Sequence, residues 1–437
     1  MTGFACGSVP DPVDISPAPR RVMTCFKCGL FHFVPPLQPG QRVRCRRCHA
    51  VVAACRRDAV RRTLAWGIAA LVMFAVTVSL PFMRIELYGR SHQMVLVNGA
   101  DALDADGLWA LGTLIFFFTI AAPAARIAGL TYVTLSLHRR HQPPLLWLVL
   151  RMAEWLRHWS MVEVYLLGAF VAYTKLIDLA DVGVMTAGYS LAGLMLLQAI
   201  TEFSFDREAT WRALERRDAV FDPARLRATL RRCVAPHTRP DHMMGCLSCG
   251  FTVLGSPGAT CPRCGAAVYP RKPQAIARAA ALLLAAAILY IPANIFPILT
   301  AIELGRGEPS TIIGGVHQLL AAKMYPLAAL VFFASIVVPA VKVLGLGLVL
   351  HTTRTRVRKR VRDRVVLFHV VEAIGRWSMI DMFMLSILVG LVQLGFVATV
   401  TPGDGALAFA AVVVLTMLAA MVFDPRLIWD AALEARR

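Results

Sequence analysis

Apolar residues occur along the chain in long blocks, separated by shorter polar segments. Each block holds about 20 residues, enough for a helix to cross a hydrocarbon layer about 30 Å thick. The polar segments between the blocks divide the chain into eight such helices, four in each half of the sequence. We predict them near residues 64–83, 108–137, 159–179, 182–203, 276–299, 324–350, 377–396 and 406–423. The pattern therefore predicts an all-α polytopic membrane protein.

The second half of the sequence repeats the first, with matching positions 216 to 218 residues apart. The clearest match is WSMVEV at 159–164 with WSMIDM at 377–382. We predict two tandem repeats, each a four-cysteine segment followed by a four-helix transmembrane module. The predicted divisions are a flexible N-terminus (1–20), ribbon 1 (21–57), module 1 (58–217), a linker (218–240), ribbon 2 (241–270) and module 2 (271–437).

Composition supports a membrane protein and charge gives its orientation. Of the residues, 57% are hydrophobic and 17% charged, whereas soluble domains carry about a quarter charged residues. The net charge of +19 is concentrated in basic loops, such as 138–144 and 354–364, which join the second and third helices of each half. Cytoplasmic loops are typically rich in Lys and Arg, so both termini and both cysteine segments are expected in the cytoplasm. The same bias explains the charge without a nucleic-acid partner.

Two shorter features complete this topology. Residues 1–60 contain no early apolar segment of the kind that opens a secretory signal. Residues 145–158 are apolar but interrupted by charges, which favours an amphipathic helix on the membrane surface. Extension of the third helix into the headgroup region is the alternative.

Each cysteine segment contains two CxxC pairs, which can present four thiolates to one tetrahedral metal ion. With an N-terminus in the reducing cytoplasm, clustered cysteines indicate metal ligands more than disulfides. We predict two structural zinc ribbons, with iron as the alternative metal. Four protein ligands leave no open position for catalysis. The predicted ligands are Cys25, Cys28, Cys45 and Cys48 in ribbon 1, and Cys246, Cys249, Cys261 and Cys264 in ribbon 2.

Charged residues lie inside the predicted spans at matching positions of the two halves. Arg126 and Lys342 fall in the second helices, and Glu163 and Asp381 near the start of the third. Charges at such depth are costly unless they are paired or hydrated. One hypothesis pairs Arg126 with Glu163 and Lys342 with Asp381, directly or across water. The alternative leaves both acids solvated at helix starts, where the helix dipole favours them.

Polar and aromatic neighbours of these acids repeat as well. Ser160 and Ser378 lie three residues before them and are expected to hydrogen-bond them or cap the helices. Trp159 and Trp377 lie four residues before them and are interpreted as interfacial anchors.

Prolines are predicted to kink the first helix of each half. Pro81, Pro292 and Pro297 lie near the outer ends of these helices, and Asn294 adds a polar side chain at depth. A packing kink is the default interpretation, and a gate or substrate-lining turn is the alternative.

These motifs together resemble the paraquat-inducible protein A family, which is also called lipophilic envelope-spanning tunnel protein A. The resemblance rests on the tandem cysteine and four-helix blocks, on IPANIFP at 291–297 and on RWSMID at 376–381. The first half lacks the IPAN element and carries Glu163 where the second half has Asp381.

The resemblance implies a multi-pass inner-membrane protein of Gram-negative bacteria that works with a mammalian-cell-entry (MCE) domain protein. The partner forms a tunnel across the periplasm, and membrane lipids would be loaded or unloaded there. Two alternatives are a non-transporting anchor for the tunnel and a redox- or stress-responsive metal-binding protein. The sequence has no Walker motif and no nucleophile–base pair, so we do not expect an enzyme.

Overall fold

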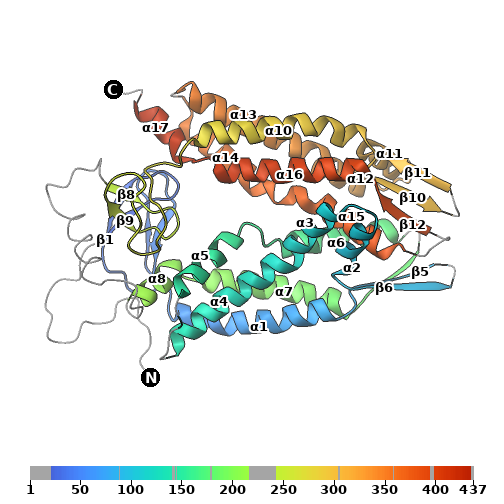
Figure 1. Cartoon of the computed structure of the whole chain (residues 1–437), viewed down its shortest axis with the longest axis horizontal. Coiled ribbons are helices and arrows are strands. Elements are labelled where there is room, and N and C mark those ends of the chain that lie inside the picture. The colour runs from blue at the N-terminus through green and yellow to red at the C-terminus, as the bar shows by residue number, and fades with distance from the viewer. Residues whose placement is uncertain are drawn as a thin grey trace.

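The computed structural model describes residues 21–434 except 88, 140–142, 144, 178–179, 216–242, 304–305, 358 and 394–397. The predicted N-terminus (1–20) and linker (218–240) lie outside the described residues. Figure 1 shows two elongated helical modules side by side, with both cysteine segments at one end and small sheets at the other. We call these the ribbon end and the sheet end.

Module 1 packs its first helix against its second and fourth, and adds a three-stranded antiparallel sheet with the order β6-β5-β7 at the sheet end. In this sheet Met83 pairs with Met94 on one side and with Val184 on the other. The elements are α1 (Ala59–Ser79), β5 (Met83–Leu87), β6 (Arg90–Met94), α2 (Asn98–Ala105), α3 (Trp109–Phe116), the π-helical turn η1 (Phe117–Ala121), α4 (Ala122–His138), α5 (Leu146–Leu156), α6 (Val162–Leu176), β7 (Asp181–Val184), α7 (Thr186–Ser204) and α8 (Arg207–Glu215).

Module 2 repeats this order, with the sheet β11-β10-β12. Leu299 pairs with Ser310 on one side and with Pro402 on the other. The elements are α10 (Ala275–Ile295), β10 (Leu299–Glu303), β11 (Arg306–Ser310), α11 (Ile312–Ala321), α12 (Tyr325–Phe332), the π-helical turn η3 (Phe333–Val337), α13 (Val338–Arg354), α14 (Val361–Gly375), the 3-10 turn η4 (Trp377–Met379), α15 (Ile380–Leu391), β12 (Ala398–Pro402), α16 (Asp404–Val422) and α17 (Arg426–Glu434).

Each ribbon is built from short antiparallel hairpins. The pairs are β1 (Arg21–Thr24) with β2 (Phe31–Val34), β3 (Arg42–Arg44) with β4 (Val51–Ala54), and β8 (Met243–Gly245) with β9 (Thr252–Leu254).

Six helical segments among the described residues are long and apolar enough to cross a membrane: Ala59–Ser79, Trp109–His138, Ala275–Ile295, Tyr325–Arg354, Val361–Leu391 and Asp404–Val422. The other two predicted spans are present as α6 and α7. Helix α6 has only 15 residues, fewer than the ~20 that a perpendicular span needs, and α7 carries Gln198 and Glu202. A mostly helical membrane protein is therefore confirmed, and the count of eight spans stays a prediction.

The third span differs between the modules. In module 2, α14 runs through η4 into α15 as one 31-residue segment, whereas in module 1 the chain breaks between α5 and α6. Helix α5, the predicted surface helix, packs lengthwise on α4, and its apolar stripe of Leu146, Leu150 and Ala153 is buried. Protein rather than membrane thus covers that stripe.

Only one of the three predicted kink prolines lies inside a helix. Pro292 is internal to α10, whereas Pro81 and Pro297 follow the ends of α1 and α10. Proline commonly follows a helix end because it cannot continue the hydrogen-bond ladder. The kink prediction is therefore wrong for Pro81 and Pro297.

The modules contact one another mainly through α15, which packs against α6 and α2 of module 1. Glycines allow this close approach: a Cβ on Gly390 would lie 2.8 Å from the Cα of Gly99, and a Cβ on Gly168 would lie 3.0 Å from Phe383. Every residue of α15 is buried, so this helix forms the centre of the molecule.

Candidate metal clusters and intramembrane polar centre

Four CxxC turns share one backbone geometry. In the first, Cys25 N–H donates to Leu30 O and Gly29 N–H donates to Cys25 O, both at 2.9 Å. The same two bonds recur at the turns that begin at Cys45, Cys246 and Cys261. The residue after the second cysteine has a left-handed φ in every turn: Gly29 (73°), His49 (57°), Gly250 (78°) and Gly265 (65°). Glycine adopts this conformation without strain, so His49 is the exception.

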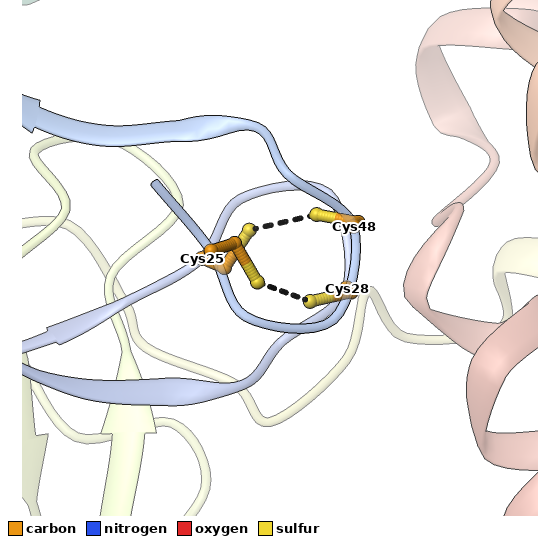
Figure 2. A group of neighbouring side chains, drawn as sticks. Cys25, Cys28 and Cys48 are labelled. Atoms are coloured by element: carbon orange, nitrogen blue, oxygen red, sulfur yellow. Dashed lines mark hydrogen bonds between the residues drawn. The ribbon is translucent and has the colours of Figure 1, made fainter. Parts of the chain in front are cut away.

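These turns aim four sulfurs at one point in each ribbon. The four Sγ atoms of each cluster lie within 4.8 Å of one another. The Sγ atoms of Cys25 and Cys48 are 3.5 Å apart, and Figure 2 shows Cys25, Cys28 and Cys48 converging. In ribbon 2 the Cys246–Cys264 and Cys249–Cys261 separations are both 3.5 Å. A tetrahedron with Zn–S bonds of 2.3 Å has S–S edges of about 3.8 Å, so the residues fit a four-coordinate metal. Two buried clusters that could bind metal are thus formed by the predicted cysteines.

Groups around cluster 1 complement thiolates. The Nε2 atom of His32 lies 3.2 Å from Cys45 Sγ, and the Arg47 N–H donates to the same sulfur at 3.4 Å. A Cβ placed on Gly29 would meet Arg271 at 3.2 Å and Arg426 at 3.3 Å, so two arginines of module 2 lie beside the first turn. Their positive charge, which they share with Asp430 and Asp424, would also favour thiolates in cluster 1 and so a bound metal.

Ribbon 2 docks on module 1, the module that precedes it. The Arg263 guanidinium lies 5.8 Å from the Trp211 ring centroid and forms ion pairs with Glu208 (2.9 Å) and Glu215 (2.5 Å) of α8. Burial alone would lower the pKa of Arg263, but these carboxylates outweigh burial and raise it. Residues of ribbon 2 and of module 1 form one continuous buried apolar cluster.

A second contact supports this docking. Glu154 of α5 accepts hydrogen bonds from Arg207 Nε at 2.7 Å and from Trp211 Nε1 at 3.3 Å, while Arg207 also donates to the Ser248 carbonyl of ribbon 2. Burial raises the pKa of the Glu154 carboxyl above its ordinary value although Arg207 lies beside it.

Ribbon 1 docks on module 2, and it also contacts its own module, where the Arg207 guanidinium of α8 lies 5.0 Å from the Phe26 ring centroid. Trp429 of α17 packs against the apolar core of ribbon 1, and the Arg47 guanidinium lies 5.8 Å from its ring centroid. Trp429 matches Trp211 in the repeat, and Arg47 and Arg263 both precede the last cysteine of their cluster. The same arginine–tryptophan interface is thus used twice, each time with ribbon and module from different repeats.

The two ribbons also contact each other. The Thr252 hydroxyl donates to the Val22 carbonyl at 2.9 Å, and Met23 forms an antiparallel bridge with Phe251. A Cβ on Gly245 would lie 2.5 Å from the Thr24 hydroxyl, so the two backbones approach closely there.

In module 1 the buried charge is paired, but not with the predicted acid. Arg126 forms an ion pair with Glu202 of α7, and Arg157 lies 3.7 Å from the same carboxylate. Glu163 is instead 40% exposed, 3.8 Å from Arg376 of module 2. A direct Arg126–Glu163 pair is therefore wrong, and Glu163 is exposed at a helix start, as in the alternative.

In module 2 the buried lysine and the buried aspartate are not paired with each other. Lys342 Nζ donates to Ser378 Oγ at 3.0 Å and to the Gly375 carbonyl at 3.3 Å, and no ion pair within 4 Å joins it to Asp381 among the described residues. Asp381 is buried, and the Ser335 hydroxyl and Lys175 of module 1 are the polar groups that act on its carboxylate. The predicted direct Lys342–Asp381 pair is wrong, although both residues lie in one buried region.

The neighbouring serines do not contact the acids. Gln198 Nε2 donates to Ser160 Oγ at 2.6 Å, and Ser378 accepts from Lys342. Sequence reasoning missed Gln198 and Glu202. Comparison of the two repeats could have found them, because the matching positions in module 2 are the smaller, uncharged residues Thr416 and Ala420.

The two tryptophans have different environments. Trp159 is buried and stacks on Phe118 with ring centroids 5.5 Å apart, so its prediction as an interfacial anchor is wrong. Trp377 is 47% exposed.

The predicted polar residue of the first helix of module 2, Asn294, hydrogen-bonds within its own helix. Its side-chain amide donates to the Tyr290 carbonyl at 2.8 Å.

The architecture defines a class: a helical membrane protein with two tandem modules and two buried four-cysteine clusters. The chain belongs to the paraquat-inducible protein A family, whose sequence profile matches residues 60–215 and 276–432. It is 31% identical to the intermembrane transport protein PqiA of Escherichia coli K12 over 94% of this chain and 96% of that protein.

Two further relatives cover most of the chain. The lipophilic envelope-spanning tunnel protein A of Escherichia coli K12 is 30% identical over 93% of this chain and 91% of its own length. A probable intermembrane transport protein of Haemophilus influenzae is 25% identical over 94% and 96%. No solved structure gives a significant match. The family prediction is confirmed, and these relatives are named for transport rather than for an enzymatic reaction.

Proposed function

We propose that this protein is the inner-membrane component of an intermembrane lipid transport system in a Gram-negative envelope. It would load or unload membrane lipids at a periplasm-spanning tunnel formed by an MCE-domain protein. The names of its relatives, intermembrane transport protein and envelope-spanning tunnel protein, support this role. With the ribbons in the cytoplasm, as the basic loops predict, the two sheets would face the periplasm and the tunnel.

The observation that carries the mechanism is the charge asymmetry between the modules. Arg126 of module 1 has a carboxylate partner, whereas Lys342 of module 2 has the hydroxyl of Ser378 and a carbonyl. Asp381 is buried and its Oδ2 has no hydrogen-bond partner among the described residues. Ionisable side chains that are buried at membrane depth without an opposite charge are costly, and they typically mark transport pathways.

We therefore assign proton coupling to Asp381 rather than to Glu163. A buried carboxylate that gains and loses a proton changes the charge of the region between the modules, which would alternately favour and disfavour an anionic lipid headgroup beside Lys342. Glu163 is 40% exposed and lies in the first turn of α6, beside Arg376 of module 2.

The test is lipid transfer by purified protein and its tunnel partner reconstituted between donor and acceptor vesicles, measured across a range of pH. Asp381→Asn is expected to abolish transfer or its pH dependence, and Glu163→Gln is the matched control expected to retain both. Full transfer with unchanged pH dependence in Asp381→Asn would refute the assignment. If both variants and wild type bind the tunnel partner but none transfers lipid, the protein is a non-transporting anchor.

We further propose that the resident metal is zinc in both clusters. Where zinc binds, it would hold each ribbon's hairpins together as a structural ion, because four thiolates leave no position for substrate. Metal analysis of the full-length protein is expected to give two zinc ions per chain. Iron in either cluster would produce visible thiolate-to-iron absorption and would overturn the assignment.

A further inference from the structure

The ribbons connect the modules in a crossed arrangement. Ribbon 2 is held by α8 of module 1 and ribbon 1 by α17 of module 2, while ribbon 1 also precedes α1 of module 1 directly in the chain. Helix α8 of module 1 is therefore connected to α17 of module 2 by three successive non-covalent interfaces. These are α8 with ribbon 2, ribbon 2 with ribbon 1, and ribbon 1 with α17. Figure 1 shows the ribbons bridging the two modules at one end.

These three interfaces are well packed. Arg263 is 1% exposed against Trp211, and the Thr252 hydroxyl lies buried between the ribbons. On the other side, Trp429 of α17 packs against the ribbon 1 core, with the Arg47 guanidinium 5.8 Å from its ring centroid. The buried pairs of Arg263 with Glu208 and Glu215 favour one docking partner, because an unpaired buried charge is costly.

We infer that the paired ribbons form a metal-dependent brace that fixes the separation of the two modules at the ribbon end. The core of ribbon 1 is small, and the cysteine cluster is a large part of it: Cys25, Cys28 and Cys45 are three of its nine buried residues. Small metal-binding domains of this size lose their fold when the metal is removed, so the docking surfaces would be lost with the metal.

Other inter-module contacts lie outside the ribbons, chiefly the packing of α15 on α2 and α6, with smaller ones such as the Arg376–Glu163 ion pair and α16 against α3. Without the brace, the modules would stay joined there and would hinge apart at the ribbon end. This inference concerns metal and module geometry, so it stands or falls separately from the lipid-transport proposal.

The test measures two distances in the full-length, metal-loaded protein. Arg61 and Arg278 are exposed residues in the first turns of α1 and α10, so a fluorophore pair there reports the ribbon end. Gln93 and Pro309, exposed on β6 and β11, report the sheet end. Both pairs are introduced as non-natural amino acids, which leaves the native cysteines untouched.

Removal of zinc by a thiol-competing chelator is expected to lengthen and broaden the Arg61–Arg278 distance distribution while the Gln93–Pro309 distribution stays narrow. Re-addition of zinc should restore the first. Unchanged Arg61–Arg278 distances after metal loss would overturn the inference. Equal broadening of both pairs would also overturn it, because it would indicate general unfolding rather than release of a brace.

A variant pair separates the brace from the metal itself. Trp211→Ala with Trp429→Ala removes both docking anchors and leaves all eight cysteines in place. It is expected to lengthen the Arg61–Arg278 distance with both zinc ions still bound. The matched control is Trp66→Ala, a partly exposed residue of α1 outside both ribbons, which should leave the distance unchanged.

Discussion

The buried ion pair of module 1 permits a quantitative test of its role in stability. Glu202→Ala would leave the Arg126 guanidinium, 6% exposed, without its carboxylate. Removing one partner of a buried pair costs about 3–5 kcal/mol, and the lower end applies because Glu202 is 33% exposed, so we expect a loss of about 3 kcal/mol. The double variant Arg126→Met/Glu202→Ala should recover most of that loss, since it leaves no unpaired charge.

The assay is reversible unfolding by denaturing detergent in mixed micelles, followed by tryptophan fluorescence. Glu163→Ala is the matched control: its exposed pair with Arg376, at 3.8 Å, should contribute only about 0–1 kcal/mol. Equal destabilisation by Glu202→Ala and Glu163→Ala would refute the reasoning. Failure of Arg126→Met to rescue Glu202→Ala would refute it as well.

Three further predictions concern the ribbons and the module interface. His49→Gly removes a left-handed non-glycine residue and should stabilise ribbon 1 by up to about 1 kcal/mol, seen as slower chelator-driven metal release; faster release would contradict this. His32→Ala removes the contact to Cys45 Sγ and should weaken metal binding at cluster 1 by about 10–100-fold in chelator competition, whereas unchanged affinity would show that the contact is dispensable. Gly390→Ala should destabilise the protein by about 1–3 kcal/mol because its Cβ would meet backbone, while Gly193→Ala, which meets only a flexible methionine, should be nearly neutral.

Local features of the fold could be predicted from sequence because their causes are local. The CxxC turns need only residues five apart, so the spacing alone predicts both clusters. Apolar block length likewise predicts most of the long helices. The π-helical turns in the second spans were missed, although the repeat-matched prolines Pro123 and Pro339 just after them gave a signal.

The charge partners could not be predicted because they depend on how helices pack. Arg126 pairs with Glu202, whereas sequence reasoning chose Glu163, the acid at a helix start, which lies beside Arg376 instead. The sequence also could not predict that each ribbon docks on the module of the other repeat. Trp211 and Trp429 occupy equivalent positions in the repeat, so the sequence allows either ribbon to dock on either residue. Comparison of the two halves would have been more informative, since Glu202 and Ala420 occupy the same repeat position.

That difference leads to a last prediction, which tests whether the asymmetry between modules is functional. Ala420→Glu would place a carboxylate on α16 at the position from which Glu202 reaches Arg126, and α16 packs against the helix that carries Lys342. If transport needs a lysine without a carboxylate partner, this variant should fold at least as stably as wild type and yet lose lipid transfer. Ala420→Gln, with the same size and no charge, should retain more transfer. Full transfer by Ala420→Glu would mean that transport does not need Lys342 without a carboxylate partner. The difference in charge pairing between module 1 and module 2 would then have no role in transport.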